Sequence, residues 1–167
     1  IDDLGRIVLP KELRRTMRIK EGESLEIYTD GDNKIVLKKY SPVNQMKDFV
    51  KEFTESMSTT NKRNIIITDN EKIVAASGDF KVDLTGKKIS KELEERLKNR
   101  NTQINNTGIS LNICQNYTIN NSSIIKPINV FGDILGCVIV EGKPQVTDSE
   151  KSLAEFGGLF MSRYLEI

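Results

Sequence analysis

Residues 1–40 carry short apolar runs separated by turn residues, a pattern that predicts a small unit rich in strands. Residues 7–9 suit a strand, and Pro10 has the fixed φ and the missing N–H that are tolerated where a helix begins. Residues 25–29 and 34–38 flank an Asp-Gly-Asp-Asn turn, which is typical of a β-hairpin. We therefore expect a strand, a short helix and a hairpin, in that order.

An apolar stripe with helical spacing follows a break at Pro42. Proline cannot continue a strand ladder and biases Ser41 toward an extended conformation, so the hairpin is expected to end here. Apolar side chains then recur at spacings of three and four residues, which predicts a helix: Met46, Phe49, Val50, Phe53 and Met57. Such a helix either packs only on its own domain, or also pairs across a dimer and transmits a change between the domains. Both readings stay open, because the stripe is too short to require a coiled coil.

The rest of the chain alternates between strand and helix patterns. Apolar runs predict strands at residues 65–68, 72–77, 111–114, 123–128 and 134–140. Ser90 is expected to be the N-cap of a helix that reaches residue 100, with Leu93 and Leu97 on its inner side.

A final helix is expected to begin at the capping box formed by Thr147 and Glu150. Its inner stripe is expected to hold Leu153, Phe156, Phe160 and Tyr164. Gly157 and Gly158 lie inside this helix, where each costs about 1 kcal/mol relative to alanine. We therefore expect another helix to approach closely there, with the helix over residues 46–57 as the candidate.

Charge is separated near the beginning of the chain, although the whole chain is nearly neutral at +1. Residues 6–20 hold six basic side chains and one acidic side chain, a net charge of +5, whereas residues 21–32 hold five acids and no base. On a helical projection, Leu13 and Met17 share one side and cations occupy the adjoining side: Lys11, Arg14, Arg15 and Arg18. This separation of charge is suited to steering a polyanion onto one surface.

Composition narrows the chemistry that the chain can perform. Its 167 residues are 37% hydrophobic and 29% charged, as in folded soluble proteins of one or two domains, and no apolar run is long enough to span a membrane. Histidine, the commonest general base and metal ligand, is absent from the sequence, as are the glycine-rich loops that cradle phosphates. We expect no catalytic residues, no metal site, no cofactor and no enzymatic activity.

Cys114 and Cys137 lack the C-x-x-C spacing of redox and zinc sites, so both are expected in the packed core of a protein from a reducing cytoplasm. The sequence opens on Ile1 and not on Met, so we expect further residues upstream.

About forty residues bury too little apolar area to fold alone without disulfides or a metal. Residues 1–40 are therefore expected to fold as an obligate homodimer, with strands from both copies in one barrel.

Residues 1–40 resemble the AbrB-type DNA-binding domain in three motifs: DLGRIVLP at residues 3–10, LRR at residues 13–15 and GESLEI at residues 22–27. The resemblance implies that two chains interdigitate into a swapped-hairpin β-barrel. It also implies that Arg6, Arg14 and Arg15 contact double-stranded DNA. Lys11 and Arg18 join them as expected DNA-binding residues on the helix geometry alone.

The order helix, two strands, helix, three strands and helix resembles a GAF domain, and its most specific piece is the strand run that contains Pro127, Gly132 and Gly136. Together the two parts resemble the stage V sporulation protein T family of endospore-forming bacteria. The expected fold class is α+β. It comprises an interwoven β-barrel dimerised in trans (residues 1–41), a linker helix (42–60) and a GAF-like antiparallel sheet with flanking helices (61–167).

That family resemblance implies a cytoplasmic transcription regulator of sporulation genes that acts in the developing spore as a dimer or tetramer, without a membrane partner. Two roles stay open for the GAF-like part: binding an unidentified small ligand, or only associating subunits. The alternative function is an antitoxin that regulates its own gene through the same DNA-binding domain. It is disfavoured because antitoxins usually follow that domain with a short flexible tail, whereas residues 43–167 have the pattern of a folded domain.

Overall fold

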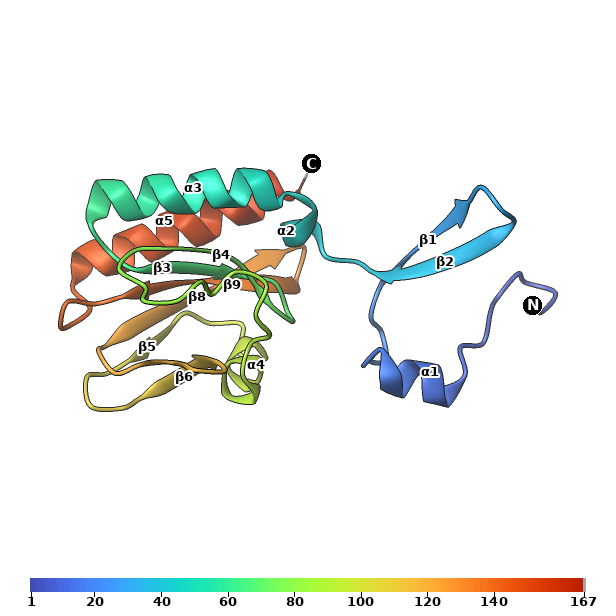
Figure 1. The fold of residues 1–167 in the computed structure, drawn as a ribbon, viewed down its shortest axis with the longest axis horizontal. Coiled ribbons are helices and arrows are strands. Elements are labelled where there is room, and N and C mark those ends of the chain that lie inside the picture. The colour runs from blue at the N-terminus through green and yellow to red at the C-terminus, as the bar shows by residue number, and fades with distance from the viewer. Residues whose placement is uncertain (167) are drawn as a thin grey trace. The chain divides into compact units, whose positions relative to one another are not determined.

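The computed structural model describes residues 1–166, which form two compact units, the head (residues 1–40) and the body (from residue 41 onward) (Figure 1). The head contains α1 (Lys11–Thr16), β1 (Leu25–Asp30) and β2 (Lys34–Lys39). The elements of the body are α2 (Pro42–Gln45), α3 (Lys47–Asn61), β3 (Ile65–Thr68), β4 (Ile73–Ser77), α4 (Lys91–Leu97), β5 (Gln103–Asn105), β6 (Leu111–Cys114), β7 (Tyr117–Ile119), β8 (Ser123–Val130), β9 (Asp133–Glu141) and α5 (Asp148–Tyr164).

The head contains the expected hairpin. β1 and β2 pair in antiparallel register from Leu25 opposite Lys39 to Asp30 opposite Lys34. Asn33 takes the left-handed conformation in the connecting turn (φ 61°), which asparagine tolerates better than most residues. The prediction of the hairpin from alternation and turn residues is therefore confirmed.

Residues 7–9 form no strand, contrary to our expectation. A strand needs a neighbouring backbone for its hydrogen bonds, and the sheet of the head pairs only β1 with β2. The apolar side chains of this stretch are left in water, with Ile7 46% and Val8 88% exposed. No residue of the head is buried. A single head therefore has no hydrophobic core.

The body is built on a five-stranded antiparallel sheet with the strand order β4-β3-β9-β8-β5. β9 is central, pairing on one side with β3 (Ile65 opposite Val140) and on the other with β8 (Ile125 opposite Ile139). Every residue of β3 is buried. Such burial is expected of a strand that is covered on both faces.

Helices cover both faces of this sheet. α3 and α5 lie side by side on one face (Figure 1), where they enclose a core that includes Val50, Met57, Ile65, Val138, Ala154 and Met161. α4 and the β6–β7 ribbon enclose a second core on the other face, which includes Ile66, Leu93, Leu97, Leu111, Ile113 and Ile139. α3 is thus part of the body's own core. Within residues 1–166, no helix is long and apolar enough to cross a membrane.

Local sequence signals located the helices of the body better than its short strands. Ser90 caps α4 by accepting a hydrogen bond from the backbone N–H of Leu93, as predicted, and the inner Leu93 and Leu97 are buried. The capping box at Thr147 and Glu150 is also present. β5 and β7 were not predicted, because each is too short to show an alternation. β5 is fixed by pairing with β8, which is distant in the sequence, and β7 by pairing with β6 across a bulge.

The inner face of α5 differs from the predicted stripe. The buried residues of α5 are Glu150, Ala154, Gly157, Gly158, Met161 and Ser162. Phe156, Phe160 and Tyr164 are exposed, so their predicted inward placement was wrong. The close approach predicted at the glycines is confirmed, since a Cβ on Gly157 would lie 2.7 Å from Cε of Met57 on α3. The sheet and α3 contact the narrow glycine face. At about 100° per residue, Phe156 lies about 100° around the helix from Gly157 and Phe160 about 60°.

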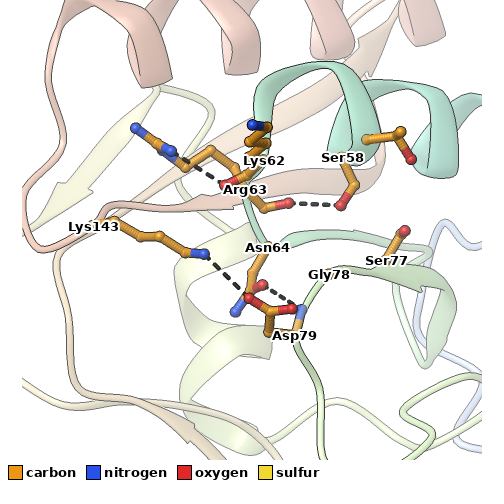
Figure 2. A pocket seen from close by; sticks show the side chains of 9 residues that line it. Ser58, Lys62, Arg63, Asn64, Ser77, Gly78, Asp79 and Lys143 are labelled. Carbon is orange, nitrogen blue, oxygen red and sulfur yellow. Dashed lines mark hydrogen bonds and ion pairs between the residues drawn. The ribbon is translucent and has the colours of Figure 1, made fainter.

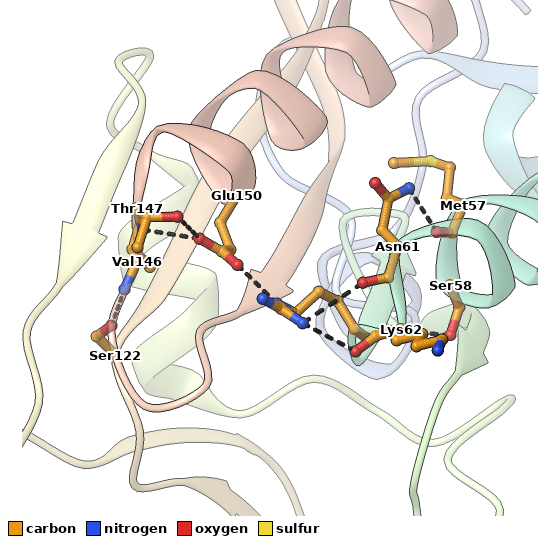
Figure 3. Close-up of polar contacts among 9 residues, drawn as sticks. Met57, Ser58, Asn61, Lys62, Ser122, Val146, Thr147 and Glu150 are labelled. Carbon is orange, nitrogen blue, oxygen red and sulfur yellow. Dashed lines mark hydrogen bonds and ion pairs between the residues drawn. The ribbon is translucent and has the colours of Figure 1, made fainter.

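A partly buried ion pair joins α5 to the turn between α3 and β3 (Figure 3). Nε of Arg63 lies 2.6 Å from Oε1 of Glu150, whose side chain is 1% exposed. Burial by itself raises the pKa of Glu150, but hydrogen bonds from the side chain and backbone N–H of Thr147 and from Arg63 outweigh it and lower the pKa to about 2. The carboxylate is therefore more stable as an ion in the folded body than in the unfolded chain.

We expect Glu150→Gln to destabilise the body by about 3 kcal/mol at neutral pH. The pKa of Glu150 falls from 4.5 to about 2 on folding, so this stabilisation is complete above about pH 4.5 and disappears as the pH falls toward 2. Urea unfolding followed by far-UV circular dichroism at several pH values measures it. Glu155→Gln on the same helix is the matched control, because Glu155 is 52% exposed in its pair with Lys126 and is expected to contribute less than about 1 kcal/mol. Equal losses for the two variants would show that Glu150 has no special role.

Candidate nucleic-acid interface

The cations predicted to bind DNA are all exposed in the head. Lys11 opens α1, Arg14 and Arg15 lie in its last turn, and none of the six residues of this helix is buried. Cations in the last turn also interact favourably with the negative end of the helix dipole. α1 therefore presents three of the five predicted cations to solvent.

Arg6 is held by a turn that precedes α1. Oδ1 of Asp2 accepts hydrogen bonds from the backbone N–H groups of Leu4 and Arg6, and Oδ2 lies 2.5 Å from Nε of Arg6. The backbone N–H of Arg6, and then its side chain, hold the pKa of Asp2 below its usual value. Asp2 thus positions Arg6 near the start of α1 and would compete with a phosphate for its guanidinium.

Arg18 does not lie on the helical face where the projection put it. α1 ends at Thr16, and Arg18 has a left-handed backbone (φ 52°). The N–H of Arg18 donates to the Arg15 carbonyl, and the N–H of Ile19 donates to the Arg14 carbonyl, which is the Schellman pattern of helix termination. The expectation that Arg18 continues the helix is therefore wrong. Arg18 is itself the residue at which the chain turns away from α1.

Acidic residues of the head partly hold its own backbone in place. Glu23 lies 3.2 Å from Nζ of Lys39 and accepts a hydrogen bond from the N–H of Lys20. Nζ of Lys39 in turn donates to the carbonyl of Arg18. The segment after α1 is thereby tied to the end of β2. Glu12 pairs with Arg15 at 3.2 Å on the exposed helix, an ion pair that surface screening leaves weak.

Both cysteines lie in the interior of the body. Cys114 and Cys137 are free and buried. Burial raises the pKa of the Cys114 thiol and raises that of Cys137 to about 12, where a thiolate does not form at neutral pH. The core position expected for them is confirmed.

The body carries an aromatic patch in which the rings of α5 are exposed, whereas Phe49 and Phe53 are partly buried against the core. The aromatic patch consists of Phe49 and Phe53 on α3 and Phe156, Phe160 and Tyr164 on α5. The rings stack across the two helices, with centroids 4.4 Å apart for Phe49 and Tyr164 and 4.9 Å apart for Phe53 and Phe160. Phe156 remains 56% exposed and Leu159 beside it 58%. The glycine pair predicted the close approach of α3, but the inner stripe was still assigned to the aromatic residues and not to the face that carries the glycines.

Both the head and the body match families of known proteins. Residues 45–166 match the family model described as stage V sporulation protein T C-terminal, transcription factor. Stage V sporulation protein T of Bacillus subtilis (strain 168) is 36% identical over 99% of this chain and 94% of its own length. The chain belongs to the stage V sporulation protein T family.

The head of this family member has further relatives. Residues 1–45 match the family model described as antidote-toxin recognition MazE, bacterial antitoxin. The transition state regulatory protein AbrB of Bacillus subtilis (strain 168) is 62% identical over 25% of this chain and 43% of its own length. This match and the family model over residues 1–45 indicate that the head is an AbrB-like N-terminal domain.

Solved structures show that the body has the GAF fold. The cofactor-binding GAF domain of the nutrient sensor CodY from Clostridium difficile has a TM-score of 0.50 at 14% identity, over 69% of this chain and 83% of that chain. Type II free methionine-R-sulfoxide reductase from Thermoplasma acidophilum has a TM-score of 0.54 at 9% identity, over 74% of this chain and 94% of that chain. At these identities the likeness concerns the fold alone.

Replacing Arg18 with glycine is expected to stabilise the head by about 1 kcal/mol, because glycine adopts the left-handed conformation without the strain imposed on a Cβ-bearing residue. Arg18→Val is expected to be destabilising, since a β-branched residue tolerates this backbone least. Residue-resolved NMR of the thermal transition of the head distinguishes the two variants. The same stability for both would mean that the left-handed terminus does not form.

Proposed function

We propose that the head binds double-stranded DNA through Arg6, Lys11, Arg14 and Arg15, with Arg18 at the edge of this surface, and that the chain thereby regulates sporulation genes. Membership of the stage V sporulation protein T family supports transcriptional regulation. The observation that carries the assignment of the surface is the short helix α1, which buries nothing and exposes its cations.

An exposed cationic helix of this kind is suited to a phosphate backbone. Neutralising phosphates releases condensed counterions, which gives affinity and a strong dependence on salt without any sequence information. Arginine can in addition bind the edge of a guanine through two parallel hydrogen bonds. Lysine acts more as a point charge. We therefore assign Lys11 to the backbone, and Arg14 and Arg15 to both backbone and base contacts.

The head performs this function as a dimer with a shared core. An isolated two-stranded hairpin is at best marginally stable in water, and the head exposes large apolar side chains that include Leu4, Val8, Ile27 and Ile35. A second copy offers the missing partner for residues 7–9 and covers these side chains. A swapped-hairpin β-barrel meets both needs, and it places two copies of α1 on one DNA-binding surface.

The aromatic patch supports a second contact between copies, through the body. Monomeric proteins seldom expose a contiguous group of large apolar side chains. Each dimeric head holds two bodies at high local concentration, so a self-complementary patch can pair within the dimer or between dimers. We assign the patch to a second copy of the same chain, which makes a tetramer the expected assembly. α3 then contributes to its own core with one face and to a partner with the other.

Several features favour a regulator over the competing functions. The antitoxin family model matches only residues 1–45, and the residues beyond it form a folded body that belongs to a transcription factor family. One structural neighbour of the body is an enzyme, but here both cysteines are buried with raised thiol pKa values. We propose a non-enzymatic regulator that works where the chromosome is, in the cytoplasm of the developing spore.

Arg14→Ala combined with Arg15→Ala is expected to weaken binding to a promoter fragment by at least tenfold, an estimate of about 1.4 kcal/mol or more. The slope of log affinity against log salt is expected to become shallower by about one for each phosphate that the variant no longer neutralises. Fluorescence anisotropy over a series of salt concentrations measures both quantities.

Lys34→Gln is the matched control, because Lys34 is an exposed cation of the same head that lies next to the acidic hairpin turn, 3.7 Å from Asp32. Its affinity and salt slope are expected to match those of the unaltered chain. A double arginine variant that binds as tightly as this control would place the DNA surface elsewhere.

Phe156→Glu combined with Phe160→Glu is expected to reduce a tetramer to a dimer in sedimentation equilibrium, because a charged side chain cannot be buried against the apolar patch of a partner. Phe131→Glu is the control, since Phe131 is 84% exposed in the turn between β8 and β9 and lies outside the aromatic patch. The same assembly for both variants would contradict a role of the patch in association.

A further inference from the structure

A polar pocket opens in the body, where several segments of the chain end together (Figure 2). It has a volume of about 510 Å³ and lies between the end of α3, the start of β3, the end of β4 and the segment after β9. This volume is within the range of sites that hold small molecules, roughly 300–1,000 Å³. Neither the cysteines nor the aromatic patch contributes to its lining.

The wall of this pocket is fixed by contacts that leave little freedom to Asn64 and Gly78. The side-chain amide of Asn64 donates to the buried carboxylate of Glu141, and its carbonyl oxygen accepts from the backbone N–H of Asp79. Gly78 has a φ of 142°, and a Cβ at this position would lie 2.2 Å from Oδ1 of Asn64. Only glycine lets β4 end so close to the start of β3. The pocket is therefore preformed.

Cations dominate the charge around the pocket. Lys62, Arg63 and Lys143 line it together with one acid, Asp79. Arg63 is already committed to Glu150 at 2.6 Å, and Nζ of Lys143 lies 3.3 Å from the exposed carboxylate of Asp79. Lys62 forms no ion pair within the described residues 1–166. It is the C-cap of α3 and has a left-handed backbone (φ 52°), which fixes where its side chain leaves the main chain. A positive charge is thus left without an acidic partner at the pocket.

Hydroxyl donors accompany this charge. Ser77 and Thr59 line the pocket, and neither hydroxyl has a hydrogen-bond partner in the part of the chain that the structure describes. Ser58, by contrast, donates to the carbonyl of Arg63 at 2.7 Å. Ammonium and hydroxyl groups that line the same pocket can donate hydrogen bonds to the oxygens of an anion.

We propose that this pocket binds a small molecule through a phosphate or carboxylate group. Lys62 neutralises the charge, the hydroxyls of Ser77 and Thr59 donate to the anionic oxygens, and Lys143 exchanges the carboxylate of Asp79 for the ligand. Asp79 thereby competes with the ligand for Lys143. A metal cation would instead require an excess of carboxylates, and Asp79 is the only acid among the described residues of the lining.

Titration of the isotope-labelled full chain with inorganic phosphate and, separately, with citrate tests this site. Ionic strength is held constant with chloride, so that general screening contributes equally at every point. Amide chemical shifts report binding residue by residue, which separates the pocket from the cations of the head. Shifts are expected at residues 58–64, 77–79 and 143. Tighter binding of phosphate indicates a phosphorylated ligand, and tighter binding of citrate indicates a polycarboxylate.

Two variants with opposite expected effects make the test independent of folding defects. Lys62→Gln is expected to weaken the binding of the preferred anion about tenfold, the effect of losing one charge-assisted hydrogen bond. Asp79→Asn is expected to tighten it about threefold, because it removes the competing carboxylate, which is 89% exposed and not needed for the core. Lys91→Gln, on an exposed lysine of α4 outside the pocket, is the control and is expected to change nothing.

Shifts confined to the head would overturn the proposal, as would equal effects of Lys62→Gln and Lys91→Gln. A fall in affinity on Asp79→Asn would do the same, because the carboxylate would then assist the ligand and not compete with it. These three outcomes concern only the body, so they do not depend on whether the head binds DNA. Failure of the proposed DNA binding would therefore leave this test intact.

Discussion

The head cannot bury its own apolar side chains, and the organisation of the protein follows from this constraint. None of its residues is buried, and Val8 is 88% exposed at a place where the sequence favours a strand. A single copy therefore has backbone groups and apolar surface with no protein partner, which a second copy can satisfy together. The cations depend on the same step, since the helix that carries three of them is attached to this hairpin. Folding, dimerisation and DNA binding are in this view one event.

The body has the opposite character. Its central strands are covered on both faces, Glu150 and Arg63 fasten the end of α3 to the start of α5, and Gly157 allows the two helices to approach. Ser41, its first residue, caps α2 and donates a hydrogen bond of 2.7 Å to Asp69 in the turn after β3. The chain that leaves the head is thus anchored to the body at once. The body therefore forms its core without a partner, and an anion in its pocket would bind to a structure that is already formed.

Signals that act over a few residues were predictable, and those that depend on distant partners were not. Ser90 and Thr147 mark helix starts because a cap is a contact with residues three positions away, and β1 and β2 follow from their own alternation and turn. Arg18 was misplaced because the helical projection assumes that the helix continues. In the structure, the left-handed backbone of Arg18 follows the end of the helix. Phe156 was assigned to the core because apolar character and spacing do not reveal which of two adjacent faces meets the sheet. The pocket around Lys62 was not foreseen, since its lining comes from three separated segments of the chain.

The central claim is that the head folds only by association, and the concentration dependence of its thermal transition tests this most directly. The measurement is made by residue-resolved NMR on the chain with Phe156→Glu and Phe160→Glu, so that the aromatic patch cannot contribute to association. The midpoint for amides of β1 and β2 is expected to rise with chain concentration, as mass action requires for a dimer that unfolds to single chains, while amides of β3 and β9 keep theirs. A midpoint for the head that is the same at every concentration would show that a single copy folds alone, and would contradict the account.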